Sequence, residues 1–112
     1  MRIAVPVVDD QLAMHFGHCQ EFAFFHTDNE ESNVEGEEVL SAPPHQPGLL
    51  PEWLKNHGAD LIIAGGMGRR AQDLFARSGI EVVVGAPQEA PRRIVEQYLD
   101  GELETGDNIC AH

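Results

Sequence analysis

The sequence has little positive charge. Seven Lys and Arg residues stand against nineteen Asp and Glu residues, which gives a formal net charge of −12 over 112 residues. Nucleic-acid binding depends on clusters of Lys and Arg, and so does binding to an anionic membrane surface. The charge balance therefore argues against both kinds of partner. An acidic protein of this kind is otherwise expected only to be soluble.

Long apolar runs are also missing. No stretch approaches the roughly 18–20 consecutive apolar residues that a membrane-spanning helix needs. The first residues, Met1 to Val8, run directly into a strand pattern without the layout of a signal peptide. We therefore expect a cytoplasmic protein with a single domain over residues 1–103 and a polar C-terminal tail over residues 104–112.

Several catalytic signatures are absent as well. The sequence holds no Gly-x-Ser-x-Gly motif, so a nucleophile-elbow hydrolase is not indicated. The strands expected over 3–8 and 61–64 contain no carboxylate, although a two-metal nuclease would need carboxylates there. Cysteine occurs only twice, at Cys19 and Cys110. In a reducing compartment such sparse cysteines are more often ligands, redox groups or core residues than a disulfide, and a Cys19–Cys110 disulfide is the remaining alternative.

The hydrophobic pattern predicts an α/β fold. Strands are expected over 2–8, 21–26, 33–40, 61–64 and 80–84, and helices over 49–57, 69–78 and 88–100. Residues 9–11 are expected to turn the chain, and residues 14–19 to form a loop or a short helical turn. Short connections favour antiparallel pairing of the first three strands, whereas strand–helix alternation implies parallel strands in the second half. We therefore expect a mixed five-stranded sheet covered by helices.

The densest group of metal-binding side chains is the segment His15-Phe-Gly-His-Cys19. Imidazole and thiolate bind iron, zinc and copper, and thiolates hold iron–sulfur clusters. If this segment turns helically, His15, His18 and Cys19 lie on one face and can bind one metal. The alternative is that Phe16 and Cys19 are core residues while both histidines are solvated.

Two further segments offer donors to the same site. Cys110 and His112 lie at the end of a polar tail that cannot bury a thiol, so we predict that they fold over the site and complete it. A tail without a role is the alternative. His45 lies in a proline-rich loop, which would present it rigidly to a ligand, and simple solvation is the alternative.

A glycine-rich turn joins a predicted strand to a predicted helix. It consists of Gly65, Gly66, Met67 and Gly68. Ligands bind beyond the carboxyl ends of strands in open α/β sheets, and a helix N-terminus favours an anion. Arg69 and Arg70 follow and add positive charge. The turn lacks the Lys-Ser/Thr pair of a Walker motif. The alternative is a tight structural turn in which Met67 only fills a gap.

Five segments of the chain, taken together, resemble one protein family. They are Arg-Ile-Ala-Val-Pro-Val at 2–7, His-Phe-Gly-His-Cys at 15–19, Asp-Leu-Ile-Ile-Ala-Gly-Gly-Met-Gly at 60–68, Gly-Ile-Glu-Val-Val-Val-Gly at 79–85 and Tyr-Leu-Asp-Gly-Glu-Leu at 98–103. The chain resembles the dinitrogenase iron–molybdenum cofactor biosynthesis family, the NifX-type cofactor-carrier domain, over nearly its whole length. The resemblance implies a three-layer, ribonuclease-H-like α/β/α fold. It also implies binding, storage or transfer of iron–molybdenum or iron–sulfur clusters rather than enzymatic turnover.

We therefore expect a cofactor carrier whose partners are cluster donor and acceptor proteins. The expected metal ligands are His15, His18, Cys19, His45, Cys110 and His112, and the turn from Gly65 to Arg69 is expected to face the cluster. Two other classes of function stay open. A mononuclear zinc or iron site in a small enzyme or sensor would use the same ligands with one open position. A metal-free module would bind an anion or a nucleotide at the glycine-rich turn.

Overall fold

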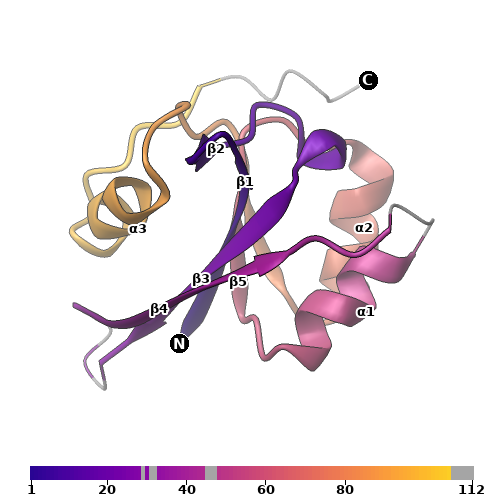
Figure 1. Ribbon diagram of the computed structural model, residues 1–112, viewed down its shortest axis with the longest axis horizontal. Helices are drawn as coiled ribbons and strands as arrows, with labels where there is room; N and C mark the ends of the chain where they lie inside the picture. Colours follow the sequence, from indigo (N-terminus) through magenta and orange to yellow (C-terminus); the bar gives the residue numbers. More distant parts are fainter. Residues whose placement is uncertain (29, 31–32, 45–47, 107–112) are drawn as a thin grey trace.

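The computed structural model describes residues 1–28, 30, 33–44 and 48–106. Its first elements are the strands β1 (Arg2–Val8) and β2 (Gln11–Leu12), the 3-10 helix η1 (Phe16–His18), and the strands β3 (Glu21–Thr27) and β4 (Val34–Ser41). They are followed by α1 (Leu49–Asn56), β5 (Leu61–Ile63), α2 (Arg69–Arg77), β6 (Glu81–Val83) and α3 (Pro91–Leu99). Figure 1 shows these helices packed on both sides of one twisted sheet.

The strands form one mixed sheet in the order β4-β3-β1-β5-β6, with β2 paired to β1 off this path. β1 is parallel to β5, and β5 is parallel to β6, whereas β1–β3 and β3–β4 are antiparallel. Both predicted halves, one antiparallel and one parallel, are therefore confirmed. The sheet has six strands rather than the five expected, because the pairing of β2 was not predicted.

β2 follows a very short turn. Asp9 and Asp10 have φ values of 53° and 65°, which tight hairpin turns need and which Asp tolerates better than most residues. Val8 therefore pairs directly with Gln11 across the turn. The expectation that Gln11 belongs to the turn was wrong, because two residues with positive φ are enough to reverse the chain.

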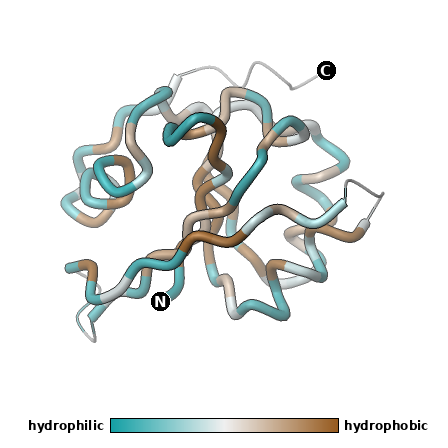
Figure 2. The backbone as a smooth tube through the Cα atoms, in the orientation of Figure 1, coloured by the Kyte–Doolittle hydropathy of each residue, from teal (hydrophilic) through white to brown (hydrophobic). Residues whose placement is uncertain are grey.

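Two hydrophobic clusters lie on opposite faces of the sheet. On one face Leu54 of α1 and Phe75 of α2 belong to the same cluster as Phe24 of β3. On the other face Ile94 of α3 belongs to the same cluster as Phe25 of β3. Successive strand residues point to opposite faces, so these neighbouring phenylalanines serve both clusters. This arrangement confirms helices on both faces, and Figure 2 shows hydrophobic residues concentrated in the central strands.

Most expected elements are present, with ends that differ by one to three residues. β1 has the predicted bounds. The last helix begins at Pro91 rather than at residue 88, because proline is favoured in the first turn and the residue before it is biased away from helical φ and ψ. Within the part of the chain that the structure describes, no helix is long and apolar enough to cross a membrane.

Candidate functional site

The segment that carries the two histidines lies directly beside the glycine-rich turn. His15 and Gly66 form an isolated parallel bridge. The Phe16 N–H donates a hydrogen bond to the Gly66 carbonyl oxygen (2.8 Å), and the Gly66 N–H donates one to the Met14 carbonyl oxygen (2.6 Å). The two motifs, which lie far apart in the sequence, are therefore held together by their backbones.

Gly65 allows this close approach. A Cβ atom at Gly65 would lie 2.9 Å from the Met14 carbonyl oxygen and 3.0 Å from the Ala13 carbonyl oxygen. Neither atom is the end of a flexible side chain that can move aside. A side chain at this position would therefore push the two loops apart, which explains in packing terms why the turn begins with glycine.

A small crevice opens where β5 and β6 end. The Gly85 N–H donates a hydrogen bond to the Gly65 carbonyl oxygen (2.7 Å), which holds the two loops that follow these strands together. The crevice has a volume of about 190 Å³ and is lined by Met14, Gly65, Gly66, Gly85, Ala86, Pro87 and Gln88. In open α/β sheets this end of the strands is where ligands bind. A lining rich in glycine also lets a ligand approach the backbone closely.

The histidine motif lies beside this crevice, because His15 is bridged to Gly66, one of the lining residues. His15 and His18 are exposed, and their ring centroids lie 5.5 Å apart with the ring planes inclined by 55°. Imidazole nitrogens bind metals at about 2.0–2.1 Å. The spacing of the two rings is therefore short enough for both to contact one metal ion or one cluster.

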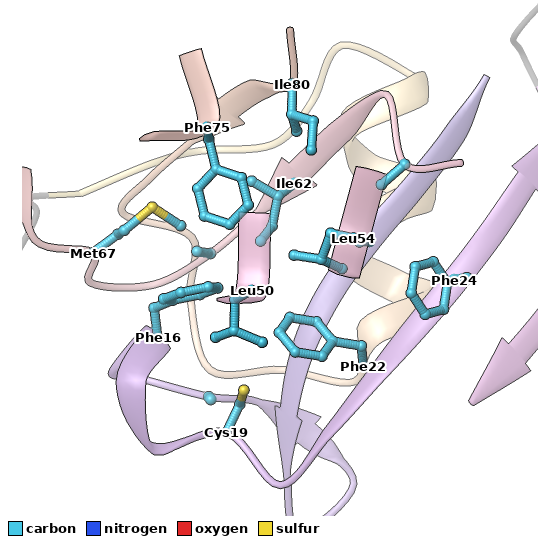
Figure 3. Packing of buried hydrophobic residues seen from close by; sticks show 14 residues of the cluster. Phe16, Cys19, Phe22, Phe24, Leu50, Leu54, Ile62, Met67, Phe75 and Ile80 are labelled. Carbon is cyan, nitrogen blue, oxygen red and sulfur yellow. The ribbon is translucent and has the colours of Figure 1, made fainter. Parts of the chain in front are cut away.

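Cys19 points the other way. Its side chain is only 3% exposed and belongs to the hydrophobic cluster under α1 and α2. Figure 3 shows its sulfur directed towards the side chains around Phe22 and Leu50. Burial raises the pKa of the Cys19 thiol to about 11, so it is protonated at neutral pH, whereas metal ligation requires the thiolate.

The expected common face of His15, His18 and Cys19 is therefore not formed. η1 is only three residues long, and the backbone is extended at both flanking positions, His15 and Cys19. The short turn sends both imidazoles outward and the thiol inward. Among the described residues, no group of three or more His, Cys, Asp and Glu side chains lies close enough together to bind a metal ion.

The remaining predicted ligands, His45, Cys110 and His112, lie outside the described residues. The described part of the tail nevertheless ends at the crevice. The Gly106 N–H donates a hydrogen bond to the carbonyl oxygen of Gly85 (2.7 Å), a residue that lines the crevice. Gly106, the last described residue, therefore lies against the loop after β6, which is itself bonded to Gly65 of the glycine-rich turn.

The glycine-rich turn itself divides into a buried and an exposed part. Met67 is fully buried in the core, which fits the gap-filling alternative. Gly68 precedes the first residue of α2, and no acidic side chain occupies the first turn of that helix. Arg69 is exposed in this turn. The helix N-terminus and Arg69 thus place positive charge a few residues along the chain from Gly66, which lines the crevice.

Sequence reasoning missed Met14 and the whole segment 85–88 of the crevice lining. Met14 lines the crevice and is 48% exposed, and Gly85 connects the crevice to the tail with a φ of 83°. A glycine directly after the run Val82-Val83-Val84 was a usable signal for a turn with positive φ at the end of a strand. Nothing in the sequence around Met14 separates it from an ordinary core methionine.

The fold and this crevice define a class of protein. It is a small mixed α/β fold with a crevice at the carboxyl ends of parallel strands, where ligands bind in open α/β sheets, next to a loop with two exposed histidines. The chain belongs to the dinitrogenase iron-molybdenum cofactor family, whose sequence profile matches residues 1–101. Membership in this family, expected from the sequence, is confirmed.

Three other proteins are similar to this chain in sequence or in fold. The chain is 28% identical over 109 residues to an uncharacterised protein of Methanocaldococcus jannaschii, which covers 93% of this chain and 90% of the relative. It is similar to the crystal structure of PH0822, with 34% identity, 94% of each chain covered and a TM-score of 0.84. The apo form of the orange protein from Desulfovibrio gigas has the same fold, with 23% identity, 96% of this chain and 93% of that chain covered, and a TM-score of 0.69.

Proposed function

We propose that this protein carries a metal–sulfur cluster of the iron–molybdenum or iron–sulfur type as cargo and passes it from a donor protein to an acceptor protein. Membership in the dinitrogenase iron-molybdenum cofactor family supports the class of cargo. The observation that carries the proposal is the bridge between His15 and Gly66, because it sets two exposed imidazoles beside a glycine-lined crevice. The apo form recorded for the orange protein fits a family whose members bind a removable group.

The ligands that we propose are the imidazoles of His15 and His18, joined by Cys110 and His112 of the tail, with His45 as a further donor. The hydrogen bond from Gly106 to Gly85 supports the role of the tail, since it fixes the chain at the crevice a few residues before Cys110. Imidazole and thiolate are suitable ligands for iron. Cys19 is not included, because its thiol is buried and its pKa is raised to about 11.

Electrostatics favours an anionic cargo. Arg69 lies in the first turn of α2, where a positive side chain opposes the helix dipole and a carboxylate would be more stable. The placement of Arg69 is therefore not explained by helix stability. A cluster with net negative charge beside the crevice would interact favourably with the Arg69 guanidinium and with the N–H groups at the helix N-terminus.

Transfer rather than catalysis fits the exposure of the site. Ligands on a surface loop and on a terminal tail can exchange with those of a partner more readily than ligands in a closed site. The strand order also supports a ribonuclease-H-like classification of the fold, without nuclease chemistry, because neither β1 nor β5 contains a carboxylate. The protein would thus hold its cargo at the strand ends and release it to an acceptor.

Anaerobic reconstitution with iron, sulfide and molybdate tests this proposal, with the absorbance spectrum and metal content per chain as readouts. The Cys110→Ser variant is expected to retain much less cluster than the wild type. Cys19→Ala is the matched control, because it removes the other thiol and leaves the proposed ligands intact. Equal cluster binding by wild type and Cys110→Ser would exclude the tail thiol, and failure of the wild type to bind any cluster would overturn the carrier function.

A further inference from the structure

Positive charge is gathered in one stretch of this acidic chain. Residues 49–77, which include α1, β5 and α2, hold four of the seven basic residues against three of the nineteen acidic ones. The four are Lys55, Arg69, Arg70 and Arg77. The rest of the chain therefore has three basic and sixteen acidic residues. The part that contains α1 and α2 thus differs in charge from everything else in the molecule.

These four side chains are not used in ion pairs within the described residues. Outside this stretch, Arg2, Arg92 and Arg93 all have carboxylates between 3.1 and 3.7 Å away. Lys55 and Arg77 lie in the last turns of α1 and α2, where positive charge stabilises the helix dipole. Arg70 lies in the first turn of α2, where positive charge opposes that dipole. Its presence is therefore explained neither by pairing nor by helix stability.

An apolar pocket lies next to Arg70. It has a volume of about 340 Å³, and its lining comprises Phe16, Gly48, Leu50, Pro51, Arg70, Ala71, Leu74 and Phe75. Arg70 is the one charged residue in this lining. The Phe16 and Phe75 rings meet edge to face at 5.5 Å between centroids, and Figure 3 shows both, with Leu50, on this side of the sheet. The pocket is large enough for one bulky apolar side chain.

We propose that this pocket and Arg70 form a docking site for an acidic segment of a partner protein, which inserts one large apolar side chain and places a carboxylate against the guanidinium. Charge complementarity selects this occupant, because the basic side chains of α1 and α2 form no ion pair with any described carboxylate. An apolar anchor beside a fixed ion pair is also a common arrangement in protein interfaces.

The docking site adjoins the crevice through Phe16. The Phe16 ring lines the pocket, while its backbone N–H is bonded to the Gly66 carbonyl oxygen, 2.8 Å away. A partner seated in the pocket would therefore lie next to the loop that carries His15 and His18. Identification of this partner as the donor or acceptor of a cluster rests on the proposed carrier function, whereas the docking site itself does not.

The test is an NMR titration of the ¹⁵N-labelled full chain with the probe peptide acetyl-Asp-Glu-Phe-Glu-Asp-amide. Shifts are expected at Leu50, Ala71 and Leu74, with millimolar affinity. Arg70→Glu is expected to weaken binding by about tenfold, as for loss of a well-placed anchor. Arg77→Glu is the matched control, since Arg77 is exposed on the same helix outside the pocket. A peptide with Ala in place of Phe is expected to bind about tenfold more weakly.

Three results would overturn the docking site. They are shifts that do not map to the pocket, equal weakening by Arg70→Glu and Arg77→Glu, and no shift with any peptide. A third peptide, acetyl-Lys-Lys-Phe-Lys-Lys-amide, tests the charge argument, and binding of this peptide at the same residues as tightly as the acidic peptide would contradict it. Sedimentation experiments test whether the chain self-associates. If it does, and if Arg70→Glu abolishes the self-association, the occupant is a second copy of the chain, and the proposal of a separate partner protein is overturned. Cluster reconstitution on the same Arg70→Glu variant distinguishes these failures from failure of the carrier function, because Arg70 is not a proposed ligand.

Discussion

His15 and Gly66 pair as neighbouring strands do, although neither belongs to a strand of the sheet. The pairing lies at the carboxyl end of β5, and hydrogen bonds between the same two loops flank it on both sides, from Phe16 and to Met14. The histidine motif and the glycine-rich turn therefore position each other. A change in either loop is expected to disturb both.

Gly65→Ala is expected to separate these loops. The new Cβ would lie 2.9 Å from the Met14 carbonyl oxygen and 3.2 Å from Leu12 Cδ2. We expect a loss of about 1–3 kcal/mol in the free energy of unfolding, as is typical of overpacking, measured by urea denaturation. The matched control is Gly17→Ala, because a Cβ at Gly17 would meet no atom within 4 Å. Equal stability of the two variants would show that the close approach is not required.

Arg69→Glu is expected to change stability and cargo binding in opposite directions. A carboxylate in the first turn of α2 interacts favourably with the helix dipole, so the free energy of unfolding should rise by about 0.3–1 kcal/mol. Cluster retention after anaerobic reconstitution should fall, because the cargo is proposed to be anionic. Urea denaturation and metal analysis of the same sample measure both effects. Arg77→Glu in the last turn of the helix should instead lower stability and leave retention unchanged, and loss of retention there would contradict a local role for Arg69.

The Cys19 thiol is expected to react slowly in the folded protein. Burial raises its pKa from 9.0 to about 11, which reduces the thiolate fraction at pH 8 by about 100-fold. In a Cys110→Ser background, the Cys19 thiol should therefore react with a disulfide reagent at least about 100-fold more slowly under native conditions than in urea. A fast reaction in the folded protein would mean that the Cys19 thiol is accessible, and Cys19 would again be a candidate metal ligand.

The same pKa shift predicts a dependence of stability on pH. The folded state holds the Cys19 proton more tightly than the unfolded state, so the stabilisation is complete below pH 9.0 and is lost as the pH rises towards about 11. Denaturation of wild type and Cys19→Ala between these pH values measures it. The stability difference between the two proteins should shift in favour of Cys19→Ala as the pH rises. A constant difference would contradict the raised pKa.

Much of the fold could be predicted because its signals are local. The β-branched run of β1 and the glycines that end the helices mark their elements without knowledge of the rest of the chain. β2 was missed because it contributes only Gln11 and Leu12, and its pairing depends on positive φ at two aspartates. Asp is common in many kinds of turn, so the sequence does not separate this hairpin from a wider loop.

The candidate site could be predicted only in part, because side-chain direction depends on tertiary packing. The sequence identified the histidine motif and the glycine-rich turn, which the structure brings together at Gly66. It did not identify which side chain of the motif turns inward. A full helical turn would have placed Cys19 with the histidines, whereas the three-residue η1 places it against the core under α1. The hydrogen bond between Gly85 and Gly106 also joins distant residues that carry no shared sequence pattern.

The most direct measurement is the content of iron, molybdenum, zinc and acid-labile sulfide per chain. It compares the wild type with the double variant His15→Ala/His18→Ala, both purified without oxygen and then reconstituted. A cluster carrier should hold several metal atoms with matching sulfide, and the double variant should hold far less at unchanged stability. One zinc per chain without sulfide, or equal cluster content in both proteins, would contradict cluster binding at the imidazoles beside Gly66.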